Sequence, residues 1–173
     1  PLKGKQANWL ILDVSASSKA HDYQHLADFD IPAGYTRGEY SLYDDGVQQD
    51  FFCEAEDAGN PVQDVYVSGA KGVSAAEYPA VVLSYNIHKE AGEPRQLTIG
   101  GKECSALYLI SDESQWSGDG MSIAHMSFYF DTDEGACVSA TFRSGTMPFD
   151  QLPDEAAMLA EAERVLAGLT LVK

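Results

Sequence analysis

Apolar and polar side chains alternate most regularly in residues 121–143. One set of alternate positions is apolar and runs through both halves of the segment: Ala124, Met126, Phe128, Phe130, Val138, Ala140 and Phe142. The positions between them are more polar: Ile123, His125, Ser127, Tyr129, Cys137, Ser139, Thr141 and Arg143. A period of two on both sides of a polar, glycine-containing turn predicts a β-hairpin. We call the apolar set the core face and the polar set the second face.

The sizes of the core-face side chains suggest how the two strands pair. If Phe130 faces Ala136 across a five-residue loop, large side chains lie opposite small ones along the hairpin. The remaining pairs are then Phe128 with Val138, Met126 with Ala140 and Ala124 with Phe142. Burying the four large side chains of this face (Met126, Phe128, Phe130 and Phe142) would stabilise the fold by about 1.5–3 kcal/mol each before the entropic cost is counted.

Shorter apolar and β-branched runs predict further strands, and one segment predicts a helix. The expected strands are residues 8–14, 39–43, 48–55, 62–68, 80–87, 96–99 and 103–110. Residues 154–167 should form the helix, because their apolar side chains recur at helical spacing. Asp154 and Glu155 lie in its first turn, where the helix dipole favours negative charge, and Gly168 is placed for a C-cap.

These elements predict an α+β domain with a mainly antiparallel sheet and the C-terminal amphipathic helix packed on the core face. We expect one domain over residues 1–173. Within it, residues 1–27 form an N-terminal extension and residues 28–173 form the core.

The charge of the chain narrows the range of partners. The formal net charge is −16, from 27 acidic and 11 basic residues. Nucleic acids and anionic lipids require cationic groups, so we expect no nucleic-acid partner. No apolar run approaches the roughly 18 residues of a membrane span, so we expect no membrane insertion of this region.

Metal and cofactor sites are not expected. Cys53, Cys104 and Cys137 are widely spaced, which favours three buried thiols, with one disulfide as the alternative in an exported protein. His21 and His25 are spaced as in an H-E-x-x-H zinc site, but no third ligand is evident. Residues 131–135 resemble a calcium loop, but glycine is fifth rather than sixth, and position twelve is a phenylalanine.

Catalytic motifs are also sparse. No G-x-S-x-G, P-loop or G-x-G-x-x-G motif occurs in the chain. Cys137 and His125 both belong to the second face, so a thiol–imidazole pair is one alternative. A hydrolase using that pair, or a metal held by His21 and His25, is therefore kept beside the non-enzymatic prediction.

The second face supplies three candidate binding residues: His125, Tyr129 and Arg143. Tyrosine and arginine are enriched at binding hot spots, and a cation in an acidic field is an anchor for a carboxylate. Three roles are open for this face. It is a solvated surface, it is covered by the N-terminal segment or by residues 74–78, or it recognises a ligand or partner.

The order of motifs resembles the PsbP-like superfamily. An F-x-I-P-x-G-Y motif at residues 29–35 precedes strand pairs, an I-G-G-K-E turn at residues 99–103, the hairpin and the C-terminal helix. This superfamily includes the extrinsic oxygen-evolving protein of photosystem II, the Ran-GTPase release factor and many bacterial lipoproteins, and the resemblance covers roughly residues 29–172. It implies an α/β/α sandwich, a protein partner, no catalytic motif, and an extracytoplasmic lipoprotein or secreted protein. A small-molecule binding protein, with its pocket between sheet and helix, is a further alternative.

Overall fold

The computed structural model describes residues 7–13, 23–37, 41–42, 49–85, 88–133 and 135–172, with side chains described for 25–37, 52–85, 88–133 and 135–172. The strands are β1 (Ala7–Asp13), β2 (Tyr23–Asp30), β3 (Tyr35–Arg37), β4 (Ser41–Leu42), β5 (Gln49–Ala55), β6 (Asp64–Lys71), β7 (His88–Ala91), β8 (Arg95–Ile99), β9 (Lys102–Asp112), β10 (Met121–Asp131), β11 (Ala136–Arg143), β12 (Met147–Pro148) and β13 (Leu169–Leu171). The helices are α1 (Tyr78–Ser84), α2 (Ser114–Ser117) and α3 (Glu155–Leu166), with a 3-10 turn at Phe149–Gln151.

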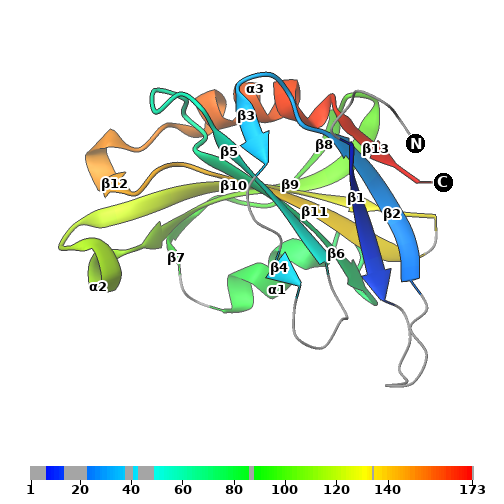
Figure 1. Cartoon of the computed structure of the whole chain (residues 1–173). Helices are drawn as coiled ribbons and strands as arrows, with labels where there is room; N and C mark the ends of the chain where they lie inside the picture. Colours follow the sequence, from blue (N-terminus) through cyan, green and yellow to red (C-terminus); the bar gives the residue numbers. More distant parts are fainter. Residues whose placement is uncertain are drawn as a thin grey trace.

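The described strands form two antiparallel sheets (Figure 1). The larger has the order β3-β5-β6-β11-β10-β9-β7, with β4, β8 and β12 paired to β5, β9 and β10. The smaller has the order β1-β2-β13, so it joins an N-terminal segment to the last strand of the chain. In Figure 1, α3 runs along one side of the large sheet, while α1 and α2 lie on the opposite side.

The predicted hairpin is confirmed as β10 and β11, but its predicted register is wrong by two residues. Phe128 faces Ala140 and Phe130 faces Val138. The loop is shorter than expected because the Thr132 N–H donates to the Ala136 carbonyl at 2.9 Å and Gly135 adopts a φ of 72°. A three-residue loop ending in a left-handed glycine is a favoured hairpin connection. A slip of two residues keeps every side chain on its expected face.

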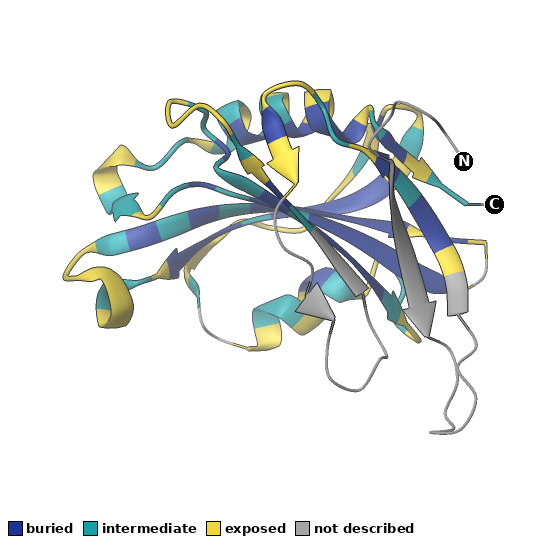
Figure 2. Ribbon diagram, in the orientation of Figure 1, coloured by how far each residue is buried: buried dark blue, intermediate teal, exposed yellow. Residues whose placement is uncertain are grey.

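The core face lies in the main hydrophobic core. Met126, Phe128, Phe130 and Phe142 are all fully buried. They share one cluster with β6, with the small sheet and with four side chains of α3: Met158, Ala162, Val165 and Leu166. Figure 2 shows this buried layer running along the middle of the sheet and under α3.

Helix α3 begins as its sequence predicts. The Asp154 carboxylate caps it by accepting a hydrogen bond from the Ala157 N–H at 2.8 Å. The helix ends at Leu166, with Ala167 as its C-cap. Gly168 follows, and its carbonyl accepts a hydrogen bond from the Asp30 N–H of β2 at 2.9 Å.

The predicted α+β class, a PsbP-like α/β/α sandwich, is wrong. Thirteen strands stand against three α-helices among the described residues, and two of those helices have only 7 and 4 residues. Helices of 7 and 4 residues form no continuous layer on the side of the sheet opposite α3, so the fold is β-rich and mostly antiparallel.

The predicted strand at residues 80–87 is also wrong, because α1 occupies residues 78–84. Pro79 lies in its first turn, where a missing N–H costs nothing. Tyr78, Val82 and Leu83 project from one side of this helix into a second, smaller hydrophobic cluster.

Two further observations bear on the expected organisation of the chain. Strand β2 spans Tyr23–Asp30, so the expected boundary between residues 27 and 28 lies within a strand. None of the helices among the described residues is long and apolar enough to span a membrane.

Candidate functional site

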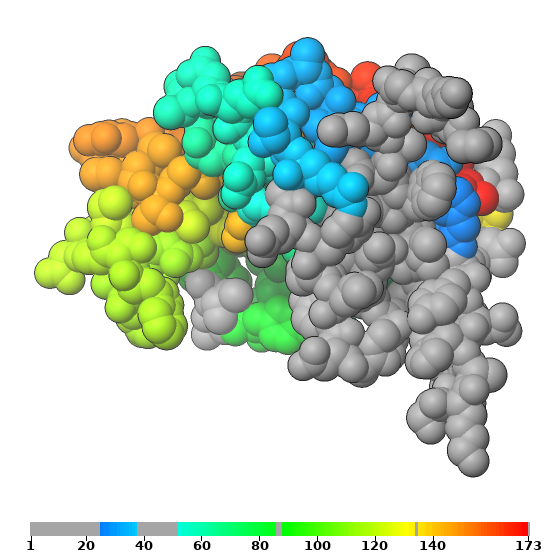
Figure 3. Space-filling model, in the orientation of Figure 1, coloured from blue at the N-terminus to red at the C-terminus, as the bar shows by residue number. Residues whose placement is uncertain are grey.

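A cavity of about 320 Å³ lies between the second face of the large sheet and α1. Five neighbouring strands supply its floor: Tyr66 and Ser68 of β6, Ser139 and Thr141 of β11, His125, Ser127 and Tyr129 of β10, Leu109 and Ser111 of β9, and His88 of β7. Tyr78 and Val82 form the α1 wall, and Glu113 closes the end near α2. Figure 3 shows α1 and α2 as separate protrusions on the same side of the molecule.

The middle of the cavity floor is polar but uncharged. The Ser68 and Ser139 hydroxyls lie 2.9 Å apart, and those of Ser127 and Thr141 lie 3.0 Å apart. Both pairs are directly opposite residues of neighbouring strands, so the register itself brings the hydroxyls together. Each hydroxyl therefore has a partner inside the protein and still presents lone pairs to the cavity.

A charged end of the cavity is formed by Ser111, His125 and Glu113. The Ser111 hydroxyl donates to Glu113 Oε1 at 3.0 Å and lies 2.8 Å from His125 Nε2. With its only proton directed at Glu113, the Ser111 oxygen must accept from an Nε2–H of His125. Burial, aided by the nearby Arg143 charge, lowers the pKa of His125 to about 4. At neutral pH His125 is therefore an uncharged donor.

A second hollow of about 410 Å³ lies across the hairpin from His125 and is lined by Phe52, Tyr66, Thr141 and Arg143. Tyr66 and Thr141 line both spaces, so the two adjoin. Arg143 Nε donates to Asp64 Oδ1 at 2.6 Å, and the guanidinium carbon lies 5.8 Å from the centre of the Phe52 ring. Burial raises the pKa of Asp64, while the hydrogen bond and charge of Arg143 oppose that rise.

The side of the cavity at α1 is held by an aromatic stack. The Tyr78 and Tyr129 rings have centroids 4.8 Å apart and planes inclined by 16°. Before the helix, the Ala75 N–H donates to Asp131 Oδ1 at 2.7 Å. Residues 74–78 therefore cover the second face near Tyr129, which is only 2% exposed. Burial also raises the pKa of Tyr129 to about 12, so its hydroxyl is protonated and neutral.

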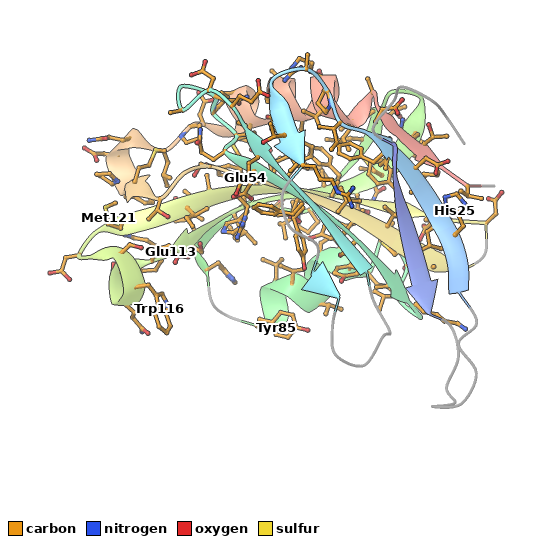
Figure 4. All side chains as sticks on the ribbon, viewed as in Figure 1. His25, Glu54, Tyr85, Glu113, Trp116 and Met121 are labelled. Atoms are coloured by element: carbon orange, nitrogen blue, oxygen red, sulfur yellow. The ribbon has the colours of Figure 1, made fainter. Side chains whose placement is uncertain are left out.

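A third hollow, of about 560 Å³, adjoins the charged end. It shares His88, Ser111 and Glu113 with the cavity and extends to Trp116 of α2. Trp116 is 85% exposed. Figure 4 shows Glu113 and Trp116 together at α2, well separated from Tyr85 at the end of α1.

The three predicted binding residues lie along this one site, although not all in one space. His125 and Tyr129 line the cavity, and Arg143 lines the adjoining hollow. The pairing register explains the arrangement, because His125 faces Arg143 across the hairpin and Tyr129 faces Ser139.

The alternative catalytic and metal sites are not assembled in the described residues. Cys137 faces Asp131 whereas His125 faces Arg143, so six residues of strand, roughly 20 Å, separate the thiol from the imidazole. His25 Nε2 lies 2.8 Å from Asp28 Oδ1, and His21 lies outside the described residues. No group of three metal-ligating side chains occurs in the described part of the chain.

Sequence analysis missed several residues of the site: Tyr66, Val82, His88, Ser111 and Glu113. In the predicted strand at residues 103–110, Leu107 and Leu109 alternate with Ala106, Tyr108 and Ile110, but Ser111 lies just beyond it. Val82 was missed because residues 80–87 were interpreted as a strand, whereas residues 74–78, which include Tyr78, were one of the segments expected to cover this face. Tyr66 and His88 belong to strands whose neighbours in the sheet are distant in sequence.

Comparisons with known proteins assign no family, since no family model matches the chain and no curated protein matches it. The resemblance to the PsbP-like superfamily therefore stays a prediction that rests on its short motifs.

Proposed function

We propose that this is a non-enzymatic binding protein that holds a small organic molecule in the cavity between the second face and α1. The observation that carries the proposal is the cavity itself. Its volume of about 320 Å³ is in the range of small-molecule sites, roughly 300–1,000 Å³, and a second hollow adjoins it. Aromatic and aliphatic side chains wall it, and a few hydroxyls on the floor can orient a ligand.

The hydrogen bonds at Ser111 favour binding over nucleophilic catalysis. A serine nucleophile must pass its proton to a histidine nitrogen that acts as a general base. Here the Ser111 hydroxyl donates to Glu113 Oε1, and His125 occupies the donor role. A pKa of about 4 also makes His125 a weak base at neutral pH.

A protein partner, the role that the PsbP-like resemblance implies, is a second candidate. One observation favours it: Trp116 is 85% exposed at the rim of the third hollow. Tryptophan is the residue type most enriched at binding hot spots together with tyrosine and arginine. Substituting Trp116 by alanine should weaken such a partner without changing small-molecule binding in the cavity.

Two substitutions on α1 test the proposed small-molecule site. Val82 lines the cavity, whereas its neighbour Val81 is 37% exposed and does not. Val82→Trp should fill the cavity, and Val81→Trp adds the same side chain elsewhere on the helix. A set of small aromatic and aliphatic compounds would be screened by NMR shift perturbation and thermal shift against both folded variants.

We expect some compounds to bind the parent and Val81→Trp equally and to bind Val82→Trp at least tenfold more weakly. Their shift perturbations should map to β10, β11 and α1. The proposal fails if no compound binds the parent, or if those that bind are unaffected by Val82→Trp.

A further inference from the structure

We propose that the ligand of this site is an organic acid whose carboxylate pairs with Arg143 and whose apolar body extends into the cavity beside α1. This inference rests on the proposed small-molecule function and specifies the chemical class of the ligand.

Arg143 is positioned but not saturated. Its Nε donates to Asp64, and the rest of the guanidinium has no further hydrogen-bond partner among the described residues. A guanidinium carries five N–H donors, so its two Nη groups can still hold a carboxylate through two parallel hydrogen bonds. The arginine side chain is 37% exposed and faces a hollow of about 410 Å³, where a ligand can reach it.

Asp64 and Phe52 hold the guanidinium in place. Asp64, with a side chain only 18% exposed, binds one edge, and the Phe52 ring lies 5.8 Å from the guanidinium carbon. A cation fixed in this way loses little side-chain entropy when it binds a second anion. Asp64 thus has a positioning role, and the carboxylate of the ligand would take the opposite edge.

The distribution of charge orients the ligand. Among the described residues that line the cavity and the 410 Å³ hollow, Arg143 is the one lysine or arginine, and Glu113 is the one acid. His125 lies between them, since it faces Arg143 across the hairpin and its Nε2 is 2.8 Å from the Ser111 hydroxyl that donates to Glu113. On the other side of Arg143 the floor follows β11 past the hydroxyls of Thr141 and Ser139. A carboxylate is attracted to Arg143 and repelled by Glu113, so an acid is favourably placed with its charge at Arg143 and its body along this row.

The spacing along β11 sets the length of the ligand. Arg143, Thr141 and Ser139 point to the same face, so the span from Arg143 to the floor beside Tyr129 is four residues, roughly 13 Å. An acid with an elongated apolar body of this length fits, whereas a compact polar acid leaves the aromatic wall at Tyr78 and Tyr129 uncovered.

Octanoate and its neutral counterpart octanamide provide a matched pair of probes. Their affinities would be measured by NMR titration at low salt for the parent, Arg143→Gln, Arg143→Lys and Val82→Trp. Arg95→Gln is the control, since Arg95 is paired with Glu155 away from this site.

In the parent and in Arg95→Gln, octanoate should bind at least tenfold more tightly than octanamide. Arg143→Gln should abolish that preference without changing the affinity for octanamide, and Arg143→Lys should keep part of it. The inference is overturned if the parent binds octanoate and octanamide equally. This comparison uses the parent protein alone, so it does not depend on whether the Arg143 variants fold. If both probes bind the parent equally and lose affinity in Val82→Trp, the inference fails and the proposed cavity stands. If neither probe binds the parent, the inference fails, and the compound screen against Val82→Trp decides the proposed cavity separately.

Discussion

Tyr78 of α1 stacks on Tyr129 of β10, with ring centroids 4.8 Å apart and an angle of 16° between the ring planes. This pair joins α1, which forms one wall of the cavity, to the β10–β11 hairpin. It also excludes water from the second face near Tyr129, which would otherwise be the solvated side of an antiparallel sheet.

Tyr78→Ala should therefore lower the free energy of unfolding by about 1–3 kcal/mol, because an aromatic pair and its burial are both lost. Urea unfolding followed by fluorescence would measure the change. Tyr85→Ala is the matched control, since Tyr85 lies at the end of the same helix and is 66% exposed; it should change stability by no more than about 0.5 kcal/mol. Equal effects of the two substitutions would show that the stack does not hold α1.

Stability should fall as the pH is lowered from 6.5 towards 4, because of His125. Burial, followed by the Arg143 charge, lowers the pKa of this imidazole from 6.5 to about 4. Between pH 6.5 and 4 the imidazole of His125 is protonated in the unfolded chain and neutral in the folded protein, so lowering the pH favours the unfolded state. The full contribution, about 3 kcal/mol, is present above pH 6.5 and is lost as the pH falls to about 4.

The free energy of unfolding, measured with urea at a series of pH values, should change less between pH 6.5 and 4 in His125→Gln than in the parent. His25→Gln, which removes an exposed histidine, is the control for the loss of a histidine as such. If the free energy of unfolding of His125→Gln depends on pH as strongly as that of the parent, His125 does not cause the loss of stability.

Much of the fold was accessible from local pattern, and the errors have physical causes. The alternation in residues 121–143 predicts which side chains share a face, and a slip of two residues preserves that parity. It does not determine the register, which depends on the hydrogen bonds of Thr132 and the conformation of Gly135. Residues 80–87 are β-branched and apolar, but packing of Tyr78 and Val82 on the sheet outweighs that weak preference.

The candidate site was only partly predictable for a related reason. His125, Tyr129 and Arg143 share one hairpin, so alternation alone places them on the same face. Tyr66 and His88 join them through pairing between strands far apart in sequence. Nothing local to those segments specifies which strands become neighbours, so a cavity built across five strands could not be assembled from the sequence.

A partly buried network joining β3 to α3 should show energetic coupling. The Tyr35 hydroxyl donates to Glu161 Oε1 at 2.8 Å, and Asn60 Nδ2 donates to the same oxygen at 3.0 Å. Hydrogen bonds from Arg164, the largest effect, help lower the pKa of Glu161 to about 2. A double-mutant cycle of Tyr35→Phe and Glu161→Gln should give a coupling free energy of about 1 kcal/mol. Additive effects would mean that the contact contributes nothing to stability.

The three cysteines should resist modification in the folded protein. All are free and buried, and burial raises the pKa of Cys53 to about 12, of Cys104 to about 11 and of Cys137 to about 12. Thiolates react and thiols do not, so Ellman's reagent at pH 8 should label them slowly in buffer and completely in denaturant. The buried-thiol arrangement would be contradicted if one thiol per chain reacted rapidly in the folded protein. It would also be contradicted if fewer than three thiols per chain reacted after unfolding.

Gly168 lies where the chain leaving α3 approaches β2 most closely. The sequence predicts a C-cap at Gly168, but Ala167 is the C-cap, and Gly168 is not among the described glycines with a positive φ. Glycine is required at this position for a steric reason, because a Cβ would lie 2.5 Å from the Asp30 carbonyl oxygen. That oxygen belongs to backbone, so relief would require β2 and β13 to separate and would strain the hydrogen bond from Asp30 N–H to the Gly168 carbonyl.

Gly168→Ala should consequently destabilise the protein by about 1–3 kcal/mol, as expected for overpacking against a fixed backbone. Gly92→Ala is a suitable control, since its Cβ would meet the Tyr108 carbonyl oxygen at 3.4 Å, an ordinary contact. Hydrogen exchange should locate the effect, with faster exchange of amides in β2 and β13 and little change in β10 and β11. If Gly168→Ala instead raises stability, as replacing a flexible glycine does where space allows, the close approach of α3 to β2 is not as described.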